Sequence, residues 1–236
     1  MTSFEPFTPQ HYVPILFLIL VTGILVMFAK KSQSHEVKKR IGLVMALITW
    51  GIMFAGSVMK MVDGSYSIQL DLPLFMCRLV AWVLPVAIFF LNRKWLKVLY
   101  FYVLAGTIQA VISPDLEQTF PSYEYIRYFV LHVGLISTTI YMVIVFQLKI
   151  TWKDLWFSFL IAQPYLLILM GINKVLGSNY GYTMHKPPTG SVLDFFGPWP
   201  WYILGAELLM LISFLLLITP FVIRRKLLLT SQDIEK

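Results

Sequence analysis

Seven long apolar runs dominate the sequence, and they constrain the fold more than any other feature. They lie at residues 12–29, 41–60, 74–91, 98–113, 125–147, 155–173 and 199–223. Most of them approach the roughly 20 residues that an α-helix needs to cross about 30 Å of hydrocarbon, and the fourth run is the shortest. The runs are continuously apolar, whereas membrane-spanning strands alternate. The sequence therefore predicts an all-α integral membrane protein, a seven-helix transmembrane bundle that forms one domain over residues 1–236.

The composition agrees with a lipid environment. The 236 residues are 58% hydrophobic and only 13% charged, and a soluble domain of this length needs more polar surface to cover its core. The net charge of +7 does not indicate nucleic-acid binding, because the basic residues form short clusters between apolar runs instead of one stripe or tail. The chain has one cysteine, which excludes an internal disulfide and a cysteine-based zinc site.

The basic clusters indicate the orientation of the chain. Fourteen of the 19 basic residues fall in the first, third and fifth loops and in the C-terminal tail. They are Lys30, Lys31, Lys38, Lys39, Arg40, Arg93, Lys94, Lys97, Lys149, Lys153, Arg224, Arg225, Lys226 and Lys236. Because short basic loops stay in the cytosol, we expect a multi-pass protein of the cell membrane with its N-terminus outside and its C-terminus inside.

Polar side chains within the apolar runs gather at one depth. Such groups are costly in hydrocarbon and usually face the interior of a bundle. Counted at about 1.5 Å per residue from the ends of the runs, most of them lie in the outer third to half of the bilayer. The set is Lys60, Cys77, Arg78, Gln109, His132, Gln163, Asn173 and Glu207. These groups either pair with one another and snorkel to the outer interface, or they line a cavity that opens toward the outer leaflet.

Cys77 and His132 are the candidates for covalent chemistry. A lone buried cysteine is usually a small hydrophobic residue. Cys77, however, follows Leu72-Pro73 at the start of a predicted helix and precedes Arg78, and both a helix N-terminus and a neighbouring cation favour a thiolate. His132 is the only histidine that falls inside a predicted span. A cysteine and a histidine at similar depth are the minimum for acyl transfer through a thioester.

Several short motifs resemble those of one protein family over nearly the whole chain. In chain order they are Leu72-Pro73-Leu74 leading into Cys77, Ala105-Gly106 with Gln109, Ser113-Pro114-Asp115-Leu116, Phe120-Pro121, His132 with Gly134, Asn179-Tyr180, Lys186-Pro187, Leu193-Asp194 and Gly197-Pro198-Trp199-Pro200-Trp201-Tyr202. On these residues the chain resembles the YwaF-like bacterial membrane proteins, a family related to the vertebrate membrane acyltransferase called transmembrane protein 164. The resemblance implies a phospholipid acyltransferase with a cysteine nucleophile and a histidine partner, and Cys77 and His132 match that pair.

One position departs from the pattern of the family. Relatives often carry a histidine two positions before the cysteine, and this chain has Phe75 there. If that histidine assists catalysis in relatives, this protein either reacts without it or has lost the activity.

The resulting hypothesis is a membrane-embedded acyltransferase or transacylase. A fatty acyl chain moves from a phospholipid to Cys77 and then to a lysolipid or another acceptor, while His132 serves as base and acid. Substrate contacts are expected from Arg78, Gln109, Asn173 and Glu207. A glutamine, an asparagine or a helix N-terminus would donate hydrogen bonds to the oxyanion. No metal, cofactor or nucleic-acid partner is expected.

Two alternatives belong to other classes of protein. One is a transporter or binding protein for a lipid or small molecule, without covalent chemistry, and the other is a scaffold subunit. Transporters often show internal repeats and broken helices near the middle of the membrane. The chain shows no internal repeat and its polar set is shallow, which disfavours transport. Glu207 either orients His132 or pairs with Lys60 or Arg78, and the sequence does not decide between these roles.

Overall fold

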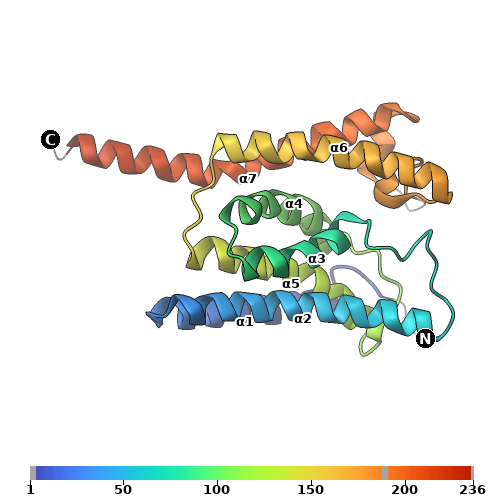
Figure 1. Ribbon diagram of the computed structural model, residues 1–236, viewed down its shortest axis with the longest axis horizontal. Helices are drawn as coiled ribbons and strands as arrows, with labels where there is room; N and C mark the ends of the chain where they lie inside the picture. The colour runs from blue at the N-terminus through green and yellow to red at the C-terminus, as the bar shows by residue number, and fades with distance from the viewer. Residues whose placement is uncertain (1–3, 188–190, 235–236) are drawn as a thin grey trace. The chain divides into compact units, whose positions relative to one another are not determined.

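The computed structural model describes residues 4–187 and 191–234. Within these ranges the chain is helical, with seven α-helices, two short 3-10 helices and no strand (Figure 1). The elements are α1 (Pro9–Lys31), α2 (His35–Val62), α3 (Met76–Phe89), α4 (Arg93–Ile112), α5 (Tyr123–Val145), α6 (Trp152–Leu176), η1 (Tyr180–Tyr182), η2 (Val192–Phe196) and α7 (Trp201–Ile234). Lys236 of the basic tail and residues 188–190 of the long loop lie outside the described residues. The all-α prediction is confirmed.

Six of the helices are long and apolar enough to cross a membrane, namely α1, α2, α4, α5, α6 and α7. The chain is therefore a multi-pass membrane protein. Helix α3 is apolar but has only 14 residues, which gives it a length of about 21 Å at 1.5 Å per residue. The third predicted span at residues 74–91 is thus longer than the helix that forms there. The backbone of Leu91 has a positive φ of 46°, which interrupts the helical conformation after α3.

Helix α4 is longer than its sequence pattern predicted. The apolar run begins at residue 98, but the helix begins at Arg93. The side chain of Asn92 accepts a hydrogen bond from the backbone N–H of Trp95 at 3.2 Å and so caps the helix one turn earlier. Basic residues of the loop therefore belong to the first turn of α4, and a search for apolar residues alone misses that turn.

Helices α1 to α5 form the first of two compact units, which extends to Ser67 and continues over Asp71–Leu148 (Figure 1). Helix α5 is at the centre of this unit, because it contacts α1, α2, α3 and α4. Its close approach to α2 depends on small residues. A Cβ added at Gly134 of α5 would lie 2.6 Å from the hydroxyl oxygen of Thr49 in α2, so any larger residue would separate the two helices.

Hydrogen bonds join the N-terminal end of α5 to its neighbours. The hydroxyl group of Tyr125 donates to the carbonyl oxygen of Gln10 in α1. The hydroxyl group of Tyr128 donates to Ala110 at the end of α4, at 2.8 Å. The bond from Tyr128 satisfies a carbonyl group in the last turn of α4 that has no partner within that helix. Together the two bonds join α5 to α1 and α4 at the end of the unit at which α2 finishes and α3 and α5 begin.

The second compact unit contains Ile68–Leu70 and the chain from Lys149 onward, including α6, α7, η1 and η2. Its loops are held by tyrosine side chains. The hydroxyl group of Tyr180 donates to the carbonyl oxygen of Ile68, and that of Tyr202 donates to Tyr182, each at 2.7 Å. The sequence predicts one domain over residues 1–236. Whether the two units form one domain depends on how they pack against each other, so this stays a prediction.

Candidate functional site

Cys77 is the second residue of α3, in the first compact unit. The helix can begin there because Phe75, the residue before its first turn, has an extended backbone with φ −70° and ψ 139°. The first N–H groups of a helix lack partners within it, and the backbone N–H groups of Cys77 and Arg78 interact with the Cys77 sulfur. The thiol is half-buried. Two backbone donors therefore converge on the atom that the sequence predicts as the nucleophile.

The side chain of Arg78 lies between an aromatic ring and a carboxylate. Its guanidinium carbon is 5.6 Å from the centroid of the Phe75 ring, a cation–π contact. On the other side, one of its nitrogens lies 3.9 Å from the Oδ1 atom of Asp71. The Phe75 ring therefore supports the arginine that follows the cysteine.

Asp71 is the most buried charged group of this region, with 6% of its side chain exposed. It accepts hydrogen bonds from the ammonium group of Lys60 at 2.7 Å and from the backbone N–H of Ser67 at 3.0 Å. Burial raises the pKa of Asp71, but these two hydrogen bonds and the positive charges of Lys60 and Arg78 outweigh it and lower the pKa below its usual value. Asp71 is therefore ionised at neutral pH.

His132 is buried in the middle of α5, with 8% of its surface exposed. Its Nδ1 atom lies 2.9 Å from the carbonyl oxygen of Tyr128, and the centroids of the two rings are 4.3 Å apart, with the rings tilted by 43°. A carbonyl oxygen can only accept, so Nδ1 is the nitrogen that carries the proton in the neutral ring. The lone pair is then on Nε2, and that nitrogen can accept a proton.

A second buried histidine, His11 in the first turn of α1, has a different environment. Its Nδ1 atom accepts a hydrogen bond from the backbone N–H of Phe7 at 3.1 Å, and its Nε2 atom donates to the carbonyl oxygen of Val111 at 2.7 Å. Both nitrogens of His11 are therefore occupied: Nε2 joins α1 to α4, and Nδ1 holds the segment that precedes α1. Of the two buried histidines, His132 is thus the one whose second nitrogen is available for proton transfer among the described residues.

The same two arginine charges act on Cys77 and on His132. The charges of Arg78 and Arg127 interact electrostatically with both the Cys77 thiol and the His132 ring. Arg127 precedes His132 by five positions on α5, about 7.5 Å along the helix axis. The thiol and the imidazole therefore share one electrostatic environment inside the first unit. Their separation, which we expect to be about 6 Å from their similar depth in the sequence, stays a prediction.

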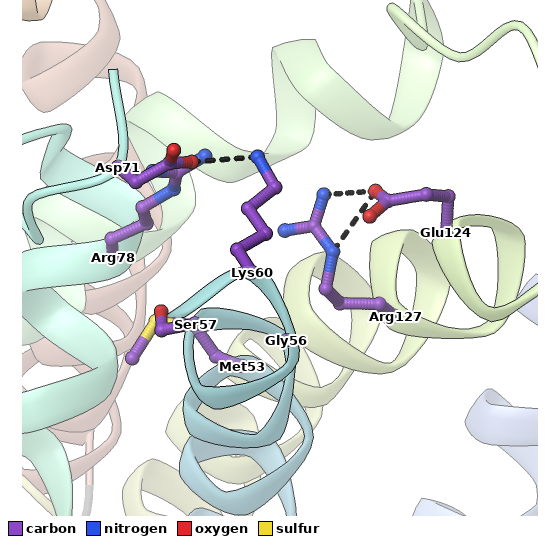
Figure 2. Close-up of a pocket in the computed structure, with 8 residues that line it drawn as sticks. All are labelled: Met53, Gly56, Ser57, Lys60, Asp71, Arg78, Glu124 and Arg127. Carbon is purple, nitrogen blue, oxygen red and sulfur yellow. Dashed lines mark hydrogen bonds and ion pairs between the residues drawn. The ribbon is translucent and has the colours of Figure 1, made fainter. Parts of the chain in front are cut away.

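Beside the two arginines is a small, open pocket, which we call the charged pocket. It lies where α2 ends and where α3 and α5 begin, and it is drawn in Figure 2. Its lining residues are Met53, Gly56, Ser57, Lys60, Asp71, Arg78, Glu124 and Arg127. Figure 2 shows Lys60 between the Asp71–Arg78 pair and the Glu124–Arg127 pair. Lys60 and Arg78 are polar residues that the sequence placed at this depth, and the structure brings them together.

The other substrate-contact candidates are placed separately. Gln109 is on α4 in the first unit, and its side chain is exposed. Glu207 is on α7 in the second unit, where it accepts a hydrogen bond from Gln163 of α6 at 2.7 Å. In the described structure Lys60 is thus paired with Asp71 and Glu207 with Gln163, two partners that the sequence analysis did not propose.

Asn173, also in the second unit, holds the loop that follows α6. Its two N–H donors are directed to the carbonyl oxygen of Tyr180 at 2.8 Å and the hydroxyl oxygen of Thr183 at 2.7 Å. Its oxygen accepts from the hydroxyl group of Ser178 and the backbone N–H of Tyr180. All of the hydrogen-bonding capacity of this amide is therefore used within the loop.

Sequence reasoning did not identify Asp71, Glu124 and Arg127 as site residues. The two acidic residues fall outside the set of polar side chains that the sequence analysis selected, although both contact cations of the charged pocket. The spacing of Glu124 and Arg127, three positions apart at the start of α5, is one signal that could have identified an ion pair. Among the described residues, no group of three or more His, Cys, Asp or Glu side chains converges as a metal site.

The sequence matches the profile of the TMEM164 family over residues 6–218. The match includes helices α1 to α6 in full and the first part of α7, and it contains both Cys77 and His132. No curated protein and no solved structure matches the chain.

Proposed function

The chain belongs to the TMEM164 family, and from that premise we propose that it is a membrane-embedded acyltransferase that moves a fatty acyl chain between lipids through a thioester on Cys77. The substrates are phospholipids and lysolipids of the bilayer. The observation that supports this proposal best is that a half-buried thiol at a helix N-terminus and a buried imidazole lie under the same two arginine charges. Such a pair provides a nucleophile and a base.

In the first half-reaction, Nε2 of His132 accepts the proton of the Cys77 thiol. The sulfur then attacks the carbonyl carbon of a lipid ester and forms a C–S bond. The ester C–O bond breaks, and the oxygen of the departing lysolipid takes the proton from Nε2. In the second half-reaction, an acceptor hydroxyl group gives its proton to Nε2 and attacks the thioester. The C–S bond breaks and the sulfur recovers its proton, so the enzyme returns to its starting state.

The negative oxygen that forms in each half-reaction needs hydrogen-bond donors. The N-terminus of α3 is the best candidate, because its first N–H groups lie beside the sulfur. Gln109 and Asn173 are weaker candidates for this role. The side chain of Gln109 is exposed, and both N–H donors of Asn173 are used in its own loop.

We assign seven crossings to the chain, with the N-terminus outside and the C-terminus in the cytosol of a cell-membrane protein. Helix α3 counts as a crossing although it has 14 residues, because apolar residues on both of its sides extend the run to 74–91. If α3 did not cross, the basic loop before α4 would lie opposite the basic loop before α2. With α3 as a crossing, all four basic clusters share the cytosolic side.

Detection of the thioester tests the proposal directly. The chain has a single cysteine, so a hydroxylamine-sensitive acyl adduct on a thiol can form only at Cys77. The protein is purified with its native lipid, and the Cys77 peptide is analysed by mass spectrometry. We expect His132→Ala to accumulate this adduct, because a thiol ionises without a base far more readily than an acceptor hydroxyl group does. The second half-reaction should therefore slow more than the first.

Activity measurements complete this test. Acyl exchange should fall at least about 100-fold in His132→Ala, the usual effect of losing a general base, and His185→Ala is the matched control because His185 lies exposed in a loop. Cys77→Ser should be nearly inactive, and Cys77→Ala should carry no adduct. Full acyl exchange in Cys77→Ala would disprove the enzyme hypothesis and favour a lipid-binding or transport protein.

A further inference from the structure

The charged pocket contains more positive than negative charge. Lys60, Arg78 and Arg127 contribute three cations, and Asp71 and Glu124 contribute two carboxylates. The excess of one positive charge is located at the ends of helices, where the positive partial charges at the N-termini of α3 and α5 outnumber the negative partial charge at the C-terminus of α2. An anion in the pocket would therefore leave it electrically balanced.

Two of the cations have N–H donors directed away from their carboxylate partners. Lys60 has three N–H donors, of which one is given to Asp71, and 40% of its side chain is exposed. Arg127 gives Nε and Nη2 to Glu124, and in the described part of the chain its Nη1 makes no hydrogen bond. Figure 2 shows Nη1 of Arg127 on the side of its guanidinium group that faces Lys60.

The close packing around Arg127 holds its side chain in this position. Its aliphatic stem crosses α2 at Gly56, where an added Cβ would lie 3.1 Å from Cδ of Arg127. The same added Cβ would lie 3.1 Å from the hydroxyl oxygen of Tyr123. A larger residue at Gly56 would displace the arginine, so local packing holds Arg127 toward the pocket.

We infer that the charged pocket is a subsite for the phosphate group of a lipid headgroup, bound by Lys60 and Arg127. A phosphodiester has one negative charge and several acceptor oxygens, which match the excess charge and the available donors of the pocket. The pocket is located at helix ends, the level of headgroups in a bilayer. This subsite rests on the function proposed above, because Arg78 links the pocket to Cys77, and the phosphate of a glycerophospholipid is a few covalent bonds from its acyl esters.

Binding of two matched lipids to the full chain tests this inference. The probes are a dialkyl ether phosphatidylcholine and the dialkylglycerol with the same chains, and their dissociation constants are measured by native mass spectrometry. Neither probe contains an ester, so acyl transfer cannot affect the result. We expect the phosphate-containing lipid to bind at least about fivefold more tightly, the scale of one partly exposed charge pair.

Four variants test whether the preference for the phosphate-containing lipid arises in the charged pocket. Lys60→Gln should lose about fivefold in affinity for the phosphate-containing lipid, whereas Lys60→Arg, which retains the cation, should stay close to the unmodified protein. Arg127→Gln should lose affinity as well. Glu124→Gln should bind more tightly, because it removes a negative charge and releases Arg127. Lys174→Gln is the control, since Lys174 is an exposed lysine at the end of α6 in the second unit, and it should change nothing.

Three results would overturn the inference. The first is equal affinity for the two lipids, and the second is a loss in Lys60→Gln no larger than in Lys174→Gln. The third is displacement of the lipid by millimolar inorganic phosphate, which would assign the pocket to a soluble phosphate. Measuring the Cys77 adduct on the same protein separates the two proposals. An adduct without a phosphate preference overturns only the subsite, and a phosphate preference without an adduct overturns only the acyl transfer.

Discussion

Replacing Asp71 should destabilise the first unit more than replacing any exposed carboxylate. Asp71 is 6% exposed and accepts the Lys60 ammonium group at 2.7 Å, with Arg78 at 3.9 Å. In Asp71→Asn, two cations lose their common carboxylate in a largely buried place, and the excess charge of the pocket rises from one to two. Removal of one partner from a buried ion pair costs about 3 kcal/mol.

The pair of Asp71 with Lys60 accounts for part of this cost. Two unit charges at 2.7 Å attract each other by about 6 kcal/mol at an effective dielectric constant of about 20. Desolvation of the carboxylate and ordering of the lysine, which is 40% exposed, offset most of that attraction. A charge-assisted hydrogen bond retains about 1.5 kcal/mol. Lys60→Gln should therefore cost about half as much as Asp71→Asn, because Asp71 keeps the backbone N–H of Ser67 and the charge of Arg78.

Thermal unfolding in detergent, followed by the fluorescence of the seven tryptophans, measures these differences. For a chain of this length, 3 kcal/mol corresponds to a decrease in Tm of about 9 °C. The double variant Lys60→Gln/Asp71→Asn completes a thermodynamic cycle and should give a coupling free energy of about 1.5 kcal/mol. Asp115→Asn is the control, because Asp115 is an exposed loop residue. Equal costs for Asp71→Asn and Asp115→Asn, or a coupling near zero, would refute the reasoning.

Two further predictions concern pH and topology. The pKa of Asp71 is lowered in the folded protein, so its contribution to stability is present at neutral pH and is lost as the pH falls below the usual range of aspartate, near 4. The difference in Tm between the unmodified protein and Asp71→Asn should accordingly shrink between pH 7 and pH 3, and a constant difference would contradict the assignment. For topology, a reporter fused after the last residue should be cytosolic, and His185→Cys, in a chain whose native cysteine is replaced by alanine, should react with an impermeant thiol reagent from outside. An external reporter would end the seven-crossing proposal.

The helices could be predicted from the sequence because their length follows from the thickness of hydrocarbon. Each of the seven predicted runs overlaps one α-helix of the structure. The boundaries were less predictable, because they depend on capping groups such as Asn92 and on a positive φ at Leu91. Such features act through one or two backbone groups and leave the average hydropathy of a segment unchanged.

The site was predictable to a smaller extent. Residue type and depth alone selected Cys77 and His132, since a thiol and an imidazole are rare inside spans. The charged residues of the pocket were not identified, because a hydropathy pattern assigns an acidic residue to a loop and gives no information on its partner. Glu124 lies in the first turn of α5, and Asp71 folds back to contact Lys60 of α2. Contacts between separate elements depend on tertiary packing, which the spacing of apolar residues along the sequence does not reveal.

The departure at Phe75 restricts how the proposed reaction can proceed. A phenyl ring cannot accept or donate a proton, so Phe75, whose ring contacts the Arg78 guanidinium group, takes no part in the proposed proton transfers. Both proton transfers then fall to one imidazole. The Nδ1 proton of His132 is directed to Tyr128, which leaves Nε2 as the nitrogen that can accept a proton in each half-reaction of the proposed cycle. Because one nitrogen serves both steps, loss of His132 should leave no second base to complete the transfer, and the acyl group should remain on the cysteine.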